Sequence, residues 1–198
     1  MLCIRGGGVL LRDMVPSDID DYLRWETVET EWQLWDAPWD YEGRSDAEQR
    51  TELARYREVL ERRVAHDAVL SDDEPRERFE ICLDDAEDPA LATHVGGLGS
   101  YLLDDAFCID ESGAHRAVGV DLCDQRARGR GHGKTAMRLF IGYFREQGLD
   151  ELYCQTWSGN ERMIGLARGL GFEECCRKPG IRRVRGGVYD GLTFRLRW

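Results

Sequence analysis

The sequence predicts an α+β protein built on one mixed, largely antiparallel sheet flanked by about four helices. Strand-like runs and segments of helical periodicity are interspersed along the chain, three strand candidates follow one another with only turn-rich segments between them, and a strand, loop, helix, strand unit comes later. The 198 residues, 42% of them hydrophobic, suffice for one substantial core, so we expect a single domain over residues 1–198.

The first part of the chain contains one predicted strand and two predicted helices. Residues 8–12 (GVLLR) form an apolar run typical of a strand, and Ser17 with Asp20 then marks a helix start. Residues 29–43 contain Pro38 and no clean periodicity, which indicates a bent helix end or an ordered loop rich in tryptophan. Ser45 and Glu48 open a second helix that runs to about Asp67. Its predicted buried stripe is Leu53, Tyr56, Leu60 and Val64.

The middle of the chain predicts an antiparallel meander after a polar loop at 68–78. Its strands are expected at 79–83, 94–103 and 117–123.

The last third changes pattern. We expect a helix from about 133 to 147 ended by Gly148, a strand at 152–156, and a helix after Asn160 ended by Gly171. Two final strands, 172–176 and 189–196, are expected on either side of an arginine-rich turn (KPGIRRVRGG).

Composition and charge limit the class of protein. The net charge is −11, divided between residues 1–112, with 29 acidic and 11 basic residues (−18), and residues 113–198, with 9 acidic and 16 basic (+7). Overall acidity argues against nucleic acid as a partner, and no apolar run is long enough to span a membrane. The start of the chain has no signal-peptide pattern, so we expect a cytoplasmic protein. Seven cysteines without a CxxC pair indicate reduced thiols and no metal site.

The stretch ARGRGHGKTA, residues 127–136, fits three phosphate-binding patterns at first inspection. A Walker loop needs glycine at position 128, which is Arg128, and a dinucleotide site needs an acidic residue where the next strand ends at Trp157. The third pattern needs only glycines whose N–H groups approach a pyrophosphate, a helix N-terminus and nearby cations. The residues of this cradle are Arg128, Gly129, Arg130, Gly131, His132, Gly133 and Lys134.

The order of elements, the RGRGHG loop at 128–133 and the segment TWSGNERMIGLARGLGF at 156–172 together resemble the GNAT superfamily of acetyl-CoA-dependent N-acetyltransferases. Within it, TWSGN…LGF and the closing VYDGLTFRL at 188–196 are most similar to the branch of ribosomal-protein N-terminal acetyltransferases. The resemblance covers nearly the whole chain.

The resemblance implies that acetyl-CoA is the cosubstrate. The cradle at 128–134 would bind its pyrophosphate, Asn160 would bond the pantetheine arm, and Leu122, Cys123 and Asp124 at a strand end would hold the thioester carbonyl by backbone donors. Asn160 could equally cap the helix that it begins.

The proton-transfer residues depart from the family pattern. Ala167 stands where many relatives carry tyrosine, Met163 where the ribosomal branch can carry serine, and Gln155 where some relatives carry a carboxylate base. Water could replace the acid, because a thiolate is a tolerable leaving group. Asp121 is the candidate catalytic base, since its alternation with its neighbours directs it toward the expected thioester; an ordinary salt bridge or turn contact is the alternative. The four histidines, His66, His94, His115 and His132, are expected to be structural or exposed.

The acceptor side of the site is expected in the tryptophan-rich segment. This segment offers acids and aromatics that could hold a cationic amine, namely Glu29, Glu31, Trp32, Trp35, Asp36 and Trp39. Glu31, Trp32 and Trp35 are the substrate-binding candidates, although the tryptophans could simply pack the core. We therefore expect an N-acetyltransferase acting on a primary amine of a small cationic metabolite, an antibiotic or a protein N-terminus. The alternatives are a silent acyl-CoA-binding regulator and an interaction module using the acidic half. The oligomeric state stays open, a homodimer included.

Overall fold

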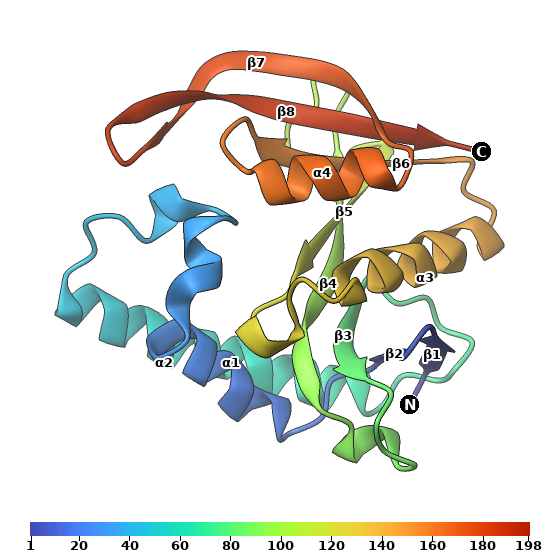
Figure 1. Cartoon of the computed structure of the whole chain (residues 1–198). Coiled ribbons are helices and arrows are strands. Elements are labelled where there is room, and N and C mark those ends of the chain that lie inside the picture. Colours follow the sequence, from blue (N-terminus) through green and yellow to red (C-terminus); the bar gives the residue numbers. More distant parts are fainter.

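The computed structural model describes residues 1–198, except for the side chain of Asp46. One eight-stranded open sheet runs through the chain in the order β1-β2-β3-β4-β5-β6-β8-β7 (Figure 1). Among the described residues, β5 and β6 are the one neighbouring pair that is parallel. The predicted α+β class, with a largely antiparallel sheet and four α-helices, is confirmed.

The bounds of the elements follow chain order. The strands are β1 (Cys3–Gly6), β2 (Val9–Arg12), β3 (Arg78–Leu83), β4 (His94–Leu103), β5 (His115–Asp121), β6 (Glu151–Trp157), β7 (Glu173–Val184) and β8 (Gly187–Arg197). The α-helices are α1 (Asp18–Thr27), α2 (Asp46–Asp67), α3 (His132–Glu146) and α4 (Glu161–Gly169). Short 3₁₀ segments are η1 (Thr30–Leu34), η2 (Pro38–Asp40), η3 (Pro89–Leu91) and η4 (Gln125–Ala127). No helix among the described residues is both long enough and apolar enough to cross a bilayer.

The predicted opening strand is half of a hairpin. β1 pairs antiparallel with β2, and the two-residue connection uses Gly7 at φ 56° and Gly8 at φ 77°. Two consecutive residues at positive φ match the right-handed twist of the paired strands, and glycine adopts that conformation without strain. The signal for β1 was therefore the glycine run itself.

Two helices cover one face of the sheet. Ser45 and Glu48 form the predicted capping box at the start of α2, which satisfies two otherwise free N–H groups. At α1 the cap differs from the prediction: Ser17 makes no side-chain cap bond, and the buried Asp18 carboxylate instead accepts the Val15 N–H at 2.8 Å. Leu60 packs on α1 in a cluster with Met14 and Ile19 that also includes Tyr56 and Val64.

The opposite face carries the main core. The buried stripe of α3, made by Ala136, Met137, Phe140 and Phe144, packs in one cluster with apolar side chains of β2, β3, β4 and β6. Ala167 of α4 joins the same cluster. Alternation along each strand separates the two faces, because successive side chains point to opposite sides.

The parallel pair β5–β6 is short, and this shortness creates space. The two strands pair with each other only at Ala117 and Tyr153. Their carboxyl-terminal halves are not paired with each other, although each stays paired with its other neighbour, β4 or β8. The segment containing η1 and η2 rises from α1 toward the β7–β8 hairpin (Figure 1). Its Trp35 carbonyl accepts bonds from Trp157 Nε1 at 2.9 Å and Asn160 Nδ2 at 2.7 Å. The tryptophan-rich segment is thereby fixed beside these strand ends.

The arginine-rich segment expected to be a turn is strand. β7 continues to Val184, and the hairpin turn consists of Arg185 and Gly186, both at positive φ. The ladder shifts register between Lys178 and Arg182, where a bulge accommodates the proline and glycine of this stretch. The prediction of a long turn was wrong because proline is tolerated on an edge strand, and β7 is the edge of this sheet.

Candidate active site

A cleft of about 630 Å³ opens where β5 and β6 separate. We call it the basic cleft because Arg128, Lys134 and Arg162 lie in its wall. The lining also includes Trp32, Trp35, Asp36, Gly119, Val120, Asp121, Leu122, Gly129, Gly131, Gly133, Gln155, Thr156, Asn160, Met163 and Leu166. Residues from β5, β6, α4, the 128–134 loop and the tryptophan-rich segment therefore meet at one cavity.

The 128–134 loop presents backbone N–H groups at the cleft. Gly131 is the N-cap of α3 at φ 86°, and Gly129 lies at φ 71°. The Thr135 N–H bonds to the Gly131 carbonyl at 3.0 Å, so the N–H groups of residues 132–134 precede the first intrahelical bond. Free N–H groups at a helix N-terminus attract an anion. The loop has the geometry that a pyrophosphate site requires.

Two glycines of the cleft have no structural reason to lack a side chain. A Cβ at Gly119 in β5 or at Gly133 in α3 would meet no atom within 4 Å, and neither residue has positive φ. Glycine weakens both strands and helices, so its presence suggests that another molecule lies against the backbone there. Gly119 was missed from the sequence, because its place in the cleft depends on the separation of β5 from β6.

The Arg128 side chain braces the site. Its Nε donates to the Leu122 carbonyl at 2.7 Å, its Nη2 donates to the Cys123 carbonyl at 2.8 Å, and its Nη1 pairs with Glu31. Burial lowers the pKa of this guanidinium, and the nearby Arg162 lowers it further. Arg128 thus ties the end of β5 to the loop and to η1, while Arg130 stays exposed and Lys134 half-buried.

The backbone N–H groups at the strand end, residues 122–124, differ in whether the protein itself supplies a hydrogen-bond acceptor. The Asp124 N–H bonds to the Val95 carbonyl at 3.1 Å, and its buried carboxylate caps η4 and pairs with Arg126. Among the described residues, by contrast, the N–H groups of Leu122 and Cys123 have no hydrogen-bond acceptor. Leu122 also lines the cleft, so its N–H group is available to a carbonyl oxygen bound there, whereas Cys123 is buried outside the lining.

Asp121 stands where the basic cleft meets a second cavity. Its carboxylate forms neither a salt bridge nor a hydrogen bond with any side chain that the structure describes. Desolvation raises its pKa well above the usual value, and the carboxylates of Asp36 and Glu26 raise it further. A carboxylate with a raised pKa and no partner can accept a proton from a bound amine.

The second cavity, of about 370 Å³, lies between α1, α2 and η1. We call it the acidic cavity. It is lined by Glu26, Trp32, Gln33, Asp36, Tyr41, Arg44, Gln49, Glu52, Leu53, Tyr56 and Asp121. Trp32, Asp36 and Asp121 belong to both linings, so the two cavities adjoin at these residues. Opposite charge on either side of the junction suits an anionic and a cationic molecule that must meet.

The three predicted acceptor residues are neighbours but face different surroundings. Trp32 lines both cavities, and its Nε1 donates to the Trp25 carbonyl at 3.0 Å. Trp35 lines only the basic cleft, with the Arg162 guanidinium 4.1 Å above its ring. Glu31 lines neither cavity. It pairs with Arg128 and Arg162 and accepts the Trp35 Nε1 hydrogen bond.

Sequence reasoning placed Trp32 and Asp36 on the acceptor side but missed other residues that face the acidic cavity. Glu26 comes from α1, Tyr41 from the segment after η2, and Tyr56 from α2. Tyr56 was expected in the buried stripe of its helix, and Glu26 and Tyr41 had no local signal that distinguishes them from surface residues.

The family positions for acid and base hold no titratable group. Met163 lines the basic cleft and Ala167 is fully buried. Gln155 Nε2 donates to the Phe107 carbonyl and the Thr193 hydroxyl, each at 3.0 Å. Thr156 carries the one hydroxyl in the cleft lining among the described residues.

Asn160 is used by the fold. Its Oδ1 accepts the Met163 N–H at 3.0 Å, which caps α4, and its Nδ2 holds the Trp35 carbonyl. It also lines the basic cleft. Of the two roles considered from the sequence, capping is present, and a bond to the pantetheine arm stays a prediction.

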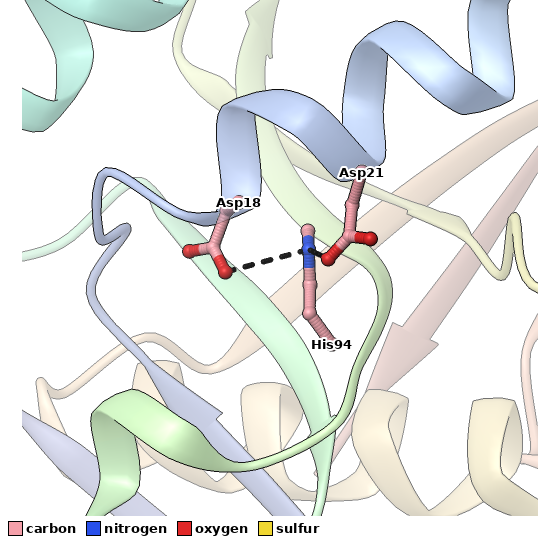
Figure 2. Close-up of side chains that lie close together, drawn as sticks. All are labelled: Asp18, Asp21 and His94. Carbon is pink, nitrogen blue, oxygen red and sulfur yellow. Dashed lines mark hydrogen bonds and ion pairs between the residues drawn. The ribbon is translucent and has the colours of Figure 1, made fainter.

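A separate cluster could suggest a metal site. Asp18, Asp21 and His94 bring their ligand atoms within 4.8 Å of one another, and Figure 2 shows the His94 ring between the two carboxylates. His94 Nε2 also lies 2.8 Å from Glu80. Burial opposes the charged imidazolium, but hydrogen bonds to Asp21 and Glu80 raise its pKa to about 9. The structure shows these residues as a buried network of hydrogen-bonded charges, and the predicted absence of a metal stays a prediction.

The splayed parallel pair, the N–H cradle and the adjoining cavities are the arrangement of a group-transfer enzyme that brings two molecules together. Comparison with protein families identifies the transferred group as acetyl. The profile described as acetyltransferase (GNAT) domain matches residues 9–173. The chain belongs to the GNAT acetyltransferase family, and the predicted N-acetyltransferase class is confirmed.

Solved structures share the fold over nearly the whole chain. An acetyltransferase of the GNAT family from Bacillus anthracis aligns with a TM-score of 0.68 at 10% identity, covering 99% of this chain and 98% of the other. A ribosomal-protein-alanine N-acetyltransferase from Brucella melitensis aligns with a TM-score of 0.59 at 22% identity, covering 95% and 99%. The ribosomal-protein acetyltransferase RimL, in complex with coenzyme A, aligns with a TM-score of 0.64 at 12% identity, covering 98% and 97%. These neighbours agree with the resemblance to the ribosomal branch. No curated protein matches the chain in sequence.

Proposed function

We propose that this protein transfers the acetyl group of acetyl-CoA to a primary amine by direct attack on the thioester. The cosubstrate lies in the basic cleft with its pyrophosphate on the N–H groups of residues 129–134, and the acceptor lies in the acidic cavity. The observation that carries the proposal is the junction of these two oppositely charged cavities at Asp121.

Each group at the junction has a role in the reaction. Asp121 takes a proton from the ammonium, so that the neutral amine can attack the acetyl carbonyl. The N–H group of Leu122 stabilises the oxyanion of the tetrahedral intermediate. The thiolate of coenzyme A then leaves and takes a proton from water, because Met163 and Ala167 have none to give.

The acceptor class supported by the charge of the acidic cavity is a cationic amine, either a small molecule or a peptide N-terminus. All seven cysteines are free thiols, which supports a reducing compartment such as the cytoplasm. We propose that residues 1–198 form one catalytic domain. A homodimer is also proposed, and analytical sedimentation would test it.

Release of free thiol from acetyl-CoA in the presence of pooled amines tests the proposed activity. We expect thiol to accumulate with cationic primary amines and mass spectrometry to find an acetylated product. Absence of thiol with every amine class, in protein that binds desulfo-CoA, would refute the proposal.

Gly133→Ala is expected to weaken binding of desulfo-CoA while leaving the free protein at least as stable. The added methyl group meets no protein atom but enters the cleft. Alanine suits a helix better than glycine, whereas inserted bulk costs about 1–3 kcal/mol, which is about 5- to 150-fold in Kd. Calorimetry and thermal unfolding measure the two quantities. Unchanged affinity would show that the cosubstrate does not lie on this loop.

Asp36→Asn is expected to shift the acidic limb of the kcat/KM profile to lower pH. Desolvation raises the Asp121 pKa first, and the Asp36 charge raises it next. Removing that charge lets Asp121 ionise at lower pH, and the ionised form is the active base. The pH profiles of both proteins with one amine measure the shift. A limb that stays in place or moves to higher pH would contradict the coupling.

A further inference from the structure

The acidic cavity holds more negative charge than the protein neutralises. Glu52 pairs with Arg44 at 3.6 Å, and the Arg44 guanidinium lies 5.0 Å from the Tyr41 ring. Glu26, Asp36 and Asp121 also face the cavity, yet no described residue forms a salt bridge with any of the three. Three carboxylates in one cavity repel one another, so a cation that binds there would be stabilised by all three.

The pKa values of Glu26 and Asp36 are both raised, in agreement with this excess of negative charge. Desolvation raises the pKa of Glu26, which the Asp36 charge also raises, against the opposing influence of Arg44. Desolvation likewise raises the pKa of Asp36, together with the neighbouring Asp40. Each carboxylate is held in a setting that favours a nearby cation.

The positions of the carboxylates indicate two cations. Asp121 and Asp36 stand at the junction with the basic cleft, whereas Glu26 lines only the acidic cavity. The attacking amine must become neutral, so it cannot remain the counter-charge of these carboxylates. A monoamine would therefore leave Glu26 and Asp36 unpaired. A second ammonium group on the same molecule would pair with them.

The walls suit the carbon chain of such a molecule. Trp32 and Tyr41 meet edge to face with ring centroids 5.8 Å apart, and Tyr56 lines the same space. Aromatic faces bind both methylene groups and ammonium ions. A volume of about 370 Å³ lies in the range of small-molecule sites.

We propose that the acidic cavity binds a small α,ω-diamine, with one nitrogen at Asp121 and the other, as an ammonium ion, between Glu26 and Asp36. This names the acceptor of the proposed function and rests on it for the reaction, though not for binding. The nitrogen at Asp121 gives a proton to that carboxylate and forms a bond to the acetyl carbon. The bond from that carbon to the coenzyme A sulfur breaks, the nitrogen gives its second proton to water, and the thiolate takes a proton from water. The products are the N-acetyl diamine and coenzyme A.

Binding tests the proposal without chemistry. Calorimetry in the presence and absence of desulfo-CoA would compare α,ω-diamines of three to six carbons with n-alkylamines of the same lengths. We expect the best diamine to bind at least about tenfold more tightly than its matched monoamine, which corresponds to ~1.4 kcal/mol. Equal binding of the two series would overturn the proposal, and this comparison requires only the wild-type protein.

Variants locate the second ammonium. Glu26→Gln is expected to reduce the diamine preference to within about threefold (~0.65 kcal/mol). Glu58→Gln, which removes the same charge from an exposed position of α2 outside the cavity, should keep the preference. An equal loss in both variants would show that the overall field of the protein, and not this cavity, selects the diamine.

Turnover separates this inference from the proposed function. Thiol release that favours diamines supports both. Tight diamine binding with no thiol release leaves the inference standing and refutes the activity. Thiol release with equal kcat/KM for both amine series, or with a strong preference for peptides carrying a free N-terminus, refutes the diamine site and leaves the activity standing.

Discussion

Asp121→Asn is expected to lower kcat/KM for acetyl transfer by about 10²–10⁴-fold, the usual contribution of a general base. The asparagine amide has nearly the same size but cannot accept a proton from the attacking ammonium. Asp121 lies at the junction of the two cavities, and no described residue pairs with its carboxylate, so the substitution breaks no salt bridge. Initial rates of thiol release at saturating acetyl-CoA measure the effect.

The control is Asp20→Asn, which removes an exposed carboxylate from α1. It should retain the wild-type rate, and both variants should bind desulfo-CoA as the wild-type protein does. Because Asp121 must be ionised to act and its pKa is raised, the wild-type rate should fall on acidification well above pH 4. Wild-type turnover in the Asp121 variant would show that the ammonium loses its proton elsewhere.

Glu80→Gln is expected to be the most destabilising conservative substitution that we predict, costing about 3–5 kcal/mol of unfolding free energy. The fully buried Glu80 accepts from Tyr22 at 2.6 Å, pairs with Arg63 at 2.7 Å and lies 2.8 Å from His94 Nε2. Burial opposes its ionisation, but Arg63, His94 and Tyr22 outweigh burial and lower its pKa to about 2. Glutamine would remove the buried anion that Arg63 and His94 share. Urea unfolding at pH 6 measures the loss.

Glu77→Gln is the matched control, because Glu77 is exposed and pairs with Arg116 at 3.3 Å. An exposed pair contributes about 0–1 kcal/mol. A loss at Glu80 no larger than at Glu77 would contradict the buried network.

The same network sets the pH dependence of stability. The folded-state pKa of His94 is raised to about 9, so its contribution is complete below about pH 6.5 and is lost as the pH rises through 9. The folded-state pKa of Glu80 is lowered to about 2, so its contribution is complete above about pH 4.5 and is lost as the pH falls through 2. Wild-type Tm should therefore decline between pH 6.5 and 9. In the Glu80 variant this decline should be smaller and should end at lower pH, because His94 loses a hydrogen-bonded anion that raises its folded-state pKa.

Local patterns predicted most of the elements. The capping box at Ser45 and Glu48 placed the start of α2, and the strand expected at 94–103 has the bounds of β4. The predictions were wrong where the tertiary structure accommodates residues that are usually unfavourable in a strand. Proline and glycine near the end of the chain suggested a turn, but β7 is an edge strand with a bulge there.

The candidate site likewise has one part that the sequence predicts and one part that depends on the tertiary structure. The glycines of the 128–134 loop alternate with other residues within one short stretch of chain, so their anion-binding geometry could be predicted from the sequence. Glu26 and Tyr56 come from helices far apart in the chain and meet only across the acidic cavity. Glu31 looked like an acceptor residue beside two tryptophans, yet it faces Arg128 and Arg162.

The sequence by itself determined the family, the order of the elements and the backbone loop that suits a diphosphate, because each depends on residues that are neighbours in the chain or in one helix or strand. The tertiary structure alone decided which carboxylates remain without a counter-charge. Whether Asp121 or Glu31 is paired depends on cations brought from other elements, and electrostatic interactions are set by distance in space and by burial.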